Sequence, residues 1–233
     1  MSAVNPTVVL VHGAMHTPWI FEPLIARLTA RGIAARAVQL PSSNPDSAAA
    51  GGLTDDVAVV QAAVDAAGGP VVLAAHSYGG VPATWAAAQV PNVAELVYLA
   101  AFVLRPGTSM LDWMGGDFPP LWIRSRDGLA VKADDPQRSI FSGVDATLAA
   151  EAVKRLNWQG LGSFTQRLGA AATGVGTTYV IATEDLALPP AVQEEWADHA
   201  NYRIRIPSGH SPHLSHPGEV TAVLADASAR AAR

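Results

Sequence analysis

The sequence predicts an α/β protein whose doubly wound, mostly parallel sheet of about six strands carries helices on both faces. Six apolar runs of strand length recur along the 233 residues, and most lack an alternation of polar and apolar residues. Runs that are apolar throughout are typical of strands buried on both faces, as in a parallel sheet. Segments with helical periodicity separate the runs. With 49% hydrophobic residues, the chain is long enough to bury the core of one such domain.

The predicted elements alternate along most of the chain. The strands are expected at residues 7–11, 33–38, 71–75, 96–101, 177–182 and 202–206, and the helices at 19–31, 53–67, 82–89, 190–200 and 217–229. In the second helix, Asp55 and Asp56 lie in the first turn, where acidic groups complement the helix dipole. Gly68 and Gly69 then end this helix.

Residues 105–174 interrupt the alternation and are too numerous for a loop. This segment is rich in aromatic and Met side chains, with helix-like patterns at 145–156 and 162–172. We therefore expect a mostly helical cap inserted into an α/β core formed by residues 1–104 and 175–233. As a group, its aromatic residues are expected to line an apolar substrate pocket. The predicted lining residues are Trp113, Phe118, Trp122 and Trp158 from the cap, and Met15 and His16 from the segment after the first strand.

Charge and composition exclude several kinds of partner. A net charge of −5 without any block of like charges gives no long-range attraction for nucleic acid or an anionic membrane. The absence of cysteine excludes disulfides and thiolate nucleophiles. Residues 1–6 lack the basic and apolar regions of a signal peptide, so a cytoplasmic location is expected. The expected partner is a small, weakly polar molecule, and the sequence leaves room for a homodimer.

Ser77 stands in the most informative segment, where an apolar run leads directly into Ala75-His76-Ser77-Tyr78-Gly79-Gly80. A serine at a sharp turn from strand to helix needs small neighbours, because only they allow the backbones to approach closely. Ala75 and Gly79, two residues on either side of Ser77, meet this requirement. The pattern predicts a serine nucleophile whose hydroxyl is lifted out of the fold by the turn, although a glycine-rich turn that happens to contain serine would look the same.

Two other residues give Ser77 a chemical context. A serine hydroxyl attacks a carbonyl only when a base takes its proton and a third group orients that base. Asp185 follows the fifth predicted strand and His210 follows the last one. The order Ser, Asp, His, each after a strand, brings all three to the carboxyl edge of a parallel sheet. We therefore predict a Ser77–His210–Asp185 catalytic triad.

An oxyanion site is expected beside this triad. A strand–serine–helix turn supplies the backbone N–H of the residue after the nucleophile, and the loop after the first strand supplies a second one. These donors are predicted to be Tyr78 and Ala14.

Each assignment has competitors in the sequence. His213 is an alternative base, Glu184 is an alternative acid, and Asp112 or Asp117 would be the acid if it followed the earlier strand. The remaining histidines are expected to have other roles: His12 and His76 structural, His199 on a helix surface and His216 in a solvated loop.

Four segments together resemble an α/β-hydrolase, and more narrowly the plant methylesterase and hydroxynitrile lyase branch with its bacterial esterase relatives. They lie at residues 11–19 (VHGAMHTPW), 75–80 (AHSYGG), 183–190 (TEDLALPP) and 209–217 (GHSPHLSHP). The resemblance covers the core and is weak across the cap. It implies a cofactor-free serine hydrolase of small esters, with Ser77 as nucleophile, His210 as base and Asp185 as the orienting acid.

Within this resemblance, lyase chemistry is disfavoured. Hydroxynitrile lyases of the branch carry a hydroxyl residue where Gly13 stands and a lysine where Ser211 stands. A ligand-binding or sensor protein that keeps the triad without turnover stays open as the alternative. The sequence therefore predicts a carboxylesterase-like hydrolase that cleaves small, largely apolar esters through an acyl-enzyme.

Overall fold

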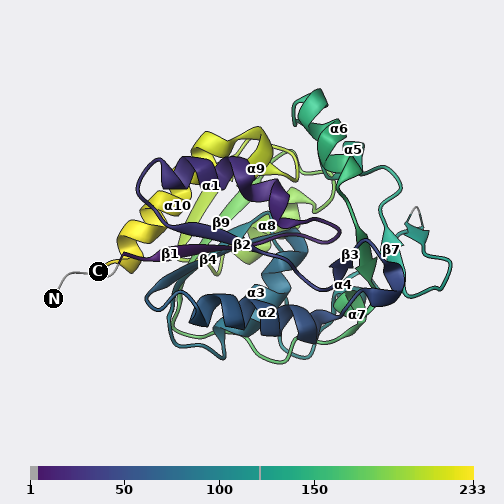
Figure 1. The fold of residues 1–233 in the computed structure, drawn as a ribbon, viewed down its shortest axis with the longest axis horizontal. Helices are drawn as coiled ribbons and strands as arrows, with labels where there is room; N and C mark the ends of the chain where they lie inside the picture. The colour runs from purple at the N-terminus through teal and green to yellow at the C-terminus, as the bar shows by residue number, and fades with distance from the viewer. Residues whose placement is uncertain (1–4, 121) are drawn as a thin grey trace.

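A six-stranded parallel sheet runs through the centre of the molecule (Figure 1), which confirms the predicted fold class. The strand order is β10-β9-β5-β4-β1-β2. The strands are β1 (Thr7–Val11), β2 (Ala35–Val38), β4 (Val71–His76), β5 (Val93–Leu99), β9 (Gly176–Ala182) and β10 (Tyr202–Ile206). This computed structural model describes residues 5–120 and 122–233. The prediction of a cytoplasmic location rests on residues 1–6, and most of these lie outside the described residues.

Helices cover both faces of the sheet, with α1 and α10 on one face and α2 and α3 on the other (Figure 1). Their bounds are α1 (Glu22–Thr29), α2 (Leu53–Asp65), α3 (Gly80–Ala87), α8 (Pro190–Ala197), α9 (Pro212–Ser215) and α10 (Pro217–Ala231). The helix predicted at 19–31 is a 3-10 turn, η1 (Pro18–Phe21), followed by α1. Within the described ranges, no helix combines the length and the apolar composition that crossing a bilayer requires.

Side-chain alternation explains why the central strands are apolar throughout. In β1, Val8 and Leu10 belong to the apolar core that includes α1 and α10, whereas Val9 and Val11 belong to the core that includes α2 and α3. All four side chains have no exposed surface. The central strands therefore contribute to a hydrophobic core on either side of the sheet, whereas the edge strand β10 contributes only to the core that includes α1 and α10.

The strand order places a crevice between β1 and β4. The chain adds β2 on one side of β1, and then adds β4, β5, β9 and β10 in turn on the other side. In such open sheets, ligands bind outside the carboxyl ends of the strands where this order reverses. The loop after β1 and the turn after β4 both lie at this point.

The segment at residues 105–174 is less helical than predicted. It supplies three strands of a second, antiparallel sheet of order β3-β8-β7-β6, which lies at the end of the molecule opposite the C-terminus (Figure 1). Its strands are β3 (Ser43–Asn44), β6 (Ile123–Arg124), β7 (Ala130–Lys132) and β8 (Trp158–Gly160). Strands of two or three residues are too short to show a period-two pattern, which is why the sequence did not reveal them. The division into core and cap domains stays a prediction.

The helices described in this segment are short: α4 (Met110–Trp113), α5 (Pro136–Ser139), α6 (Ala146–Lys154) and α7 (Gly162–Thr165). The helix predicted at 145–156 corresponds to α6, but the one predicted at 162–172 ends at Thr165. Beyond it, Leu168 exchanges backbone hydrogen bonds with residues 107 and 108. A Cβ on Gly169 would lie 2.3 Å from a ring carbon of Trp85, so the ring leaves no room for a side chain there. These contacts hold the chain out of a helical path.

Candidate active site

Ser77 lies at the sharp turn between β4 and the 3-10 turn η3 (Ser77–Gly79). Its φ of +51° is in the left-handed region that residues other than glycine rarely adopt. The backbone of the loop after β1 comes very close to this turn, because a Cβ on Gly79 would lie 2.5 Å from the backbone oxygen of His12. A Cβ on Gly80 would lie 2.4 Å from another backbone oxygen. The turn therefore requires glycines after Ser77 and presents the serine at the carboxyl edge of the sheet.

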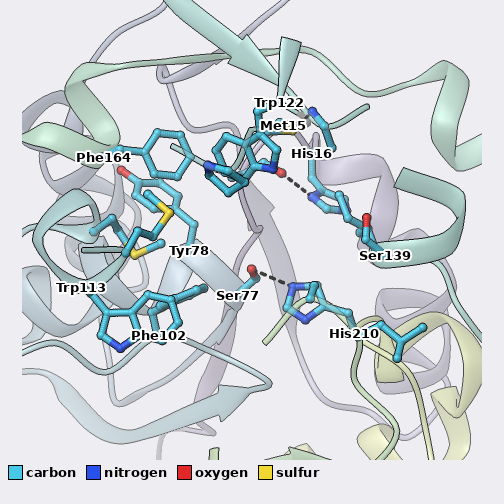
Figure 2. Close-up of a pocket in the computed structure, with 18 residues that line it drawn as sticks. Met15, His16, Ser77, Tyr78, Phe102, Trp113, Trp122, Ser139, Phe164 and His210 are labelled. Carbon is cyan, nitrogen blue, oxygen red and sulfur yellow. Dashed lines mark hydrogen bonds between the residues drawn. The ribbon is translucent and has the colours of Figure 1, made fainter. Parts of the chain in front are cut away.

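The structure brings Ser77, His210 and Asp185 into one hydrogen-bonded row. His210 Nε2 lies 2.9 Å from Ser77 Oγ (Figure 2), and His210 Nδ1 lies 2.7 Å from Asp185 Oδ2. Since an ionised carboxylate only accepts hydrogen bonds, Nδ1–H donates to Asp185 and Nε2 is left to accept the serine hydroxyl. All three residues are buried. This is the arrangement in which a histidine can take a proton from a serine.

Asp185 is held in place by three N–H donors. Its Oδ1 accepts the backbone N–H groups of Ala187 at 2.7 Å and Leu188 at 2.9 Å. Its Oδ2 also accepts Gln193 Nε2 at 2.8 Å. These bonds offset the cost of burying the carboxylate and orient it toward His210. Sequence analysis missed Gln193, which lies in α8 and belongs to no motif.

The loop after β1 places Ala14 beside the same cavity as Ser77 and Tyr78. Within the described residues, the Ala14 N–H makes no hydrogen bond, whereas the next N–H, that of Met15, donates to Gln159 Oε1 at 2.7 Å. Ala14 is therefore the residue of this pair whose N–H is free to meet a ligand.

A cavity of about 310 Å³ opens onto Ser77 and His210 (Figure 2). Most of its walls are aromatic, aliphatic or thioether side chains, and no Asp, Glu, Lys or Arg is among the described lining residues. The lining residues are Ala14, Met15, His16, Ser77, Tyr78, Phe102, Met110, Trp113, Met114, Pro119, Trp122, Ala133, Ser139, Ile140, Phe164, Leu186, Ala187 and His210. Such a lining suits an uncharged ligand.

The predicted pocket residues divide into two groups. Met15, His16, Trp113 and Trp122 line the cavity. Phe118 and Trp158 do not, so their prediction as lining residues is wrong.

The reason is the packing of each ring. Phe118 packs behind the wall, with ring centroids 6.1 Å from Trp122 and 5.7 Å from Phe164. Trp158 lies under the ammonium group of Lys132, 4.6 Å from it. Phe102, which follows β5, lines the cavity and was missed, because the sequence interpretation looked for the lining only in the cap and in the segment after the first strand.

The competing residues lie apart from the hydrogen-bonded row. His213 is fully buried, and its ring nitrogens have no partner among the described residues. Glu184 is exposed. Asp112 is exposed and pairs with Arg167, and Asp117 is exposed as well. The row therefore contains the base and the acid that the sequence favoured.

Buried histidines surround the site. Burial lowers the pKa of His12 to about 4 and that of His16 to about 3, and it holds the pKa values of His76 and His213 well below the usual range. The His76 ring centroid lies 4.9 Å from that of His210. These four rings are consequently neutral near neutral pH. Among the described residues, no three His, Asp or Glu side chains are grouped so that they could hold a metal ion.

Known proteins with similar sequences support the fold described above. A family model described as "Alpha/beta hydrolase family" matches residues 8–223. The "Probable hydrolase R7" of Phoma sp. is 27% identical over 240 residues, which cover 95% of this chain and 98% of that protein.

Two solved structures share the architecture of the chain. A pyrethroid hydrolase from Sphingobium faniae superposes with a TM-score of 0.83 at 21% identity, covering 97% of this chain and 98% of that one. The methylesterase MES16 from Arabidopsis superposes with a TM-score of 0.82 at 20% identity, covering 96% of this chain and 99% of that one. At these identities the likeness establishes the fold.

Proposed function

The chain belongs to the alpha/beta hydrolase family, and on that premise we propose that it is a serine esterase that cleaves small, neutral carboxylic esters. The observation that carries the proposal is the Ser77–His210–Asp185 row opening onto an uncharged cavity. The names of two relatives, a pyrethroid hydrolase and a methylesterase, also favour ester substrates. A cavity of about 310 Å³ is at the lower end of the usual range for ligand sites, which favours a small ester.

In the proposed acylation step, the ester carbonyl oxygen lies between the N–H groups of Ala14 and Tyr78. Ser77 Oγ bonds to the carbonyl carbon while His210 Nε2 accepts the serine proton. The two N–H groups stabilise the negative charge that develops on the carbonyl oxygen. His210 then donates the same proton to the alcohol oxygen, the carbon–oxygen bond breaks, and the alcohol leaves an acyl-Ser77.

Water completes the cycle by the reverse sequence of proton transfers. His210 accepts a proton from water as the water oxygen bonds to the acyl carbon. The bond to Ser77 Oγ then breaks, Oγ regains a proton from His210, and the acid is released. Asp185 keeps the Nδ1 proton in place and stabilises the imidazolium during both steps.

Acylation of Ser77 is the direct test of this function. Mixing the protein with excess p-nitrophenyl acetate is expected to release nitrophenol and, after acid quenching, to yield one acetylated peptide containing Ser77 by mass spectrometry. An acyl-enzyme accumulates where deacylation is the slower step, so quenching in the first turnovers gives the strongest signal. The proposal would be contradicted if nitrophenol were released no faster than in buffer alone and no acetylated Ser77 were found.

The uncharged lining predicts discrimination against anionic esters. p-Nitrophenyl hexanoate and the mono-p-nitrophenyl ester of adipic acid have acyl chains of equal length, but the second ends in a carboxylate. Burying that group without a cationic partner costs several kcal/mol, so its kcat/KM is expected to be lower by about 100-fold or more. The two rates are measured side by side at low substrate concentration. Equal values would show that the acyl chain does not enter this cavity.

A further inference from the structure

The loop that carries Ala14 is held by the short strand β8 of the second sheet. The Met15 N–H donates to Gln159 Oε1 at 2.7 Å, and the Asn157 N–H donates to the Met15 carbonyl oxygen at 2.8 Å. Met15 has a φ of +69°, a left-handed conformation that is strained for a residue other than glycine. Both backbone groups of a strained residue are therefore fixed by a segment far away in the sequence.

The orientation of the Gln159 amide is determined by its neighbours. Its Nε2 lies 2.7 Å from Ser42 Oγ and 2.8 Å from Ser163 Oγ. Ser42 Oγ donates its own proton to Asp56, and Ser163 Oγ donates to a backbone oxygen. Each hydroxyl can therefore only accept from Gln159, which places Nε2 toward the serines and Oε1 toward Met15. Gln159 has no exposed surface, so no water competes for these bonds.

The same network reaches the other side of the site. Asp56 Oδ2 accepts Ser42 Oγ at 2.5 Å and the hydroxyl of Tyr78 at 2.6 Å. Tyr78 is the residue after Ser77, and its N–H is the second proposed oxyanion donor. One buried chain of hydrogen bonds thus joins the Ala14–Met15 loop to Tyr78 through Gln159, Ser42 and Asp56.

We propose that Gln159 is a positioning residue for the oxyanion site. By accepting the Met15 N–H, it fixes the loop so that the preceding N–H, that of Ala14, stays free and points toward the ester carbonyl oxygen at Ser77. The inference rests on the proposed function. Gln159 touches no substrate, so its effect is expected on transition-state stabilisation and not on ground-state binding.

The test compares Gln159→Met with Gln137→Met. Gln159→Met keeps most of the side-chain volume and removes the acceptor of the Met15 N–H. Gln137→Met makes the same substitution at an exposed position that does not line the cavity. For Gln159→Met, kcat for p-nitrophenyl butyrate is expected to fall by about 10- to 100-fold with KM little changed. Gln137→Met is expected to keep kcat near the wild-type value.

A second readout separates positioning from a general loss of structure. An alkyl trifluoromethyl ketone forms a tetrahedral adduct with an active-site serine, so its inhibition constant reports on the oxyanion site. Gln159→Met is expected to raise this constant by the same factor by which it lowers kcat. A folded Gln159→Met variant with wild-type kcat and wild-type inhibition would overturn the inference.

If Gln159→Met does not fold, the wild-type protein still provides a test. The Met15 amide is expected to exchange its hydrogen as slowly as amides of β1, because a buried side chain accepts its N–H bond. Fast exchange of this one amide would overturn the inference. Failure of the proposed function is a different result, since it would appear as an absence of Ser77 acylation in the wild-type protein.

Discussion

Replacing Ser77 by alanine is expected to lower kcat/KM for p-nitrophenyl acetate by roughly 10⁴-fold or more. The reason is that the nucleophile of the proposed mechanism is lost, while the cavity and the N–H groups of Ala14 and Tyr78 stay in place. The methyl side chain of alanine fits, because it is smaller than the serine it replaces. Ester hydrolysis is followed by nitrophenol absorbance, and thermal melting checks that the variant is folded.

Two further variants make this result specific. Asp185→Asn preserves the size of the acid but cannot hold the Nδ1–H tautomer of His210, so a loss of about 10⁴-fold in kcat is expected. Ser47→Ala is the matched control, because Ser47 is a serine that does not line the cavity. It is expected to leave the rate unchanged. If Ser77→Ala hydrolyses the ester as fast as the wild-type protein, the hydrolase mechanism fails and the ligand-binding alternative takes its place.

The residues of the hydrogen-bonded row could be predicted because strand topology alone brings them together. Ser77, Asp185 and His210 each follow a strand of a parallel sheet. Their side chains therefore meet at one edge, whatever the loops contain. Gln193 and Gln159 could not be predicted in this way. Each acts through one amide group whose partners become neighbours only after the segments have packed together.

The lining of the cavity was harder to predict for a related reason. Trp122 and Phe118 are close in sequence and similar in chemistry, yet only Trp122 lines the cavity. Which ring faces inward depends on how short strands and loops pack, and residues 105–174 provide too few regular elements to fix side-chain directions in advance. Periodicity identifies a buried face only where an element continues for several turns or alternations, as in β1 and α2.

Acid is expected to unfold the protein because its core contains neutral histidines. His12, His16, His76 and His213 are buried, and burial lowers all four pKa values. In the unfolded chain these groups titrate near their reference pKa of about 6.5. Above this value they are neutral in both states, so they leave the free energy of unfolding independent of pH. Below it the unfolded chain binds protons that the folded protein does not, and stability falls as the pH falls.

Asp56 acts in the opposite direction over part of this range. Burial raises its pKa to about 6, against the lowering effect of its hydrogen bonds with Ser42 and Tyr78. Between that value and its unfolded pKa of about 4, the folded state binds one proton more than the unfolded chain, which adds stability as the pH falls. Near pH 5 the unfolded chain binds four more protons than the folded protein at the histidines and one fewer at Asp56, a net excess of about three protons. The expected slope near pH 5 is therefore roughly 4 kcal/mol per pH unit.

The free energy of unfolding of an ordinary domain is about 5–15 kcal/mol. At this slope it falls to zero within a few pH units below about 6.5. Urea unfolding followed by tryptophan fluorescence, at a series of pH values, measures it directly. His213→Leu provides the sharpest variant, because both ring nitrogens of His213 lack a partner among the described residues and the ring packs at 5.1 Å from Phe21. It is expected to lower the slope by about one proton, or 1.4 kcal/mol per pH unit. His199→Leu, at an exposed position, should leave the slope unchanged, and an equal change in both variants would refute a role for the buried ring.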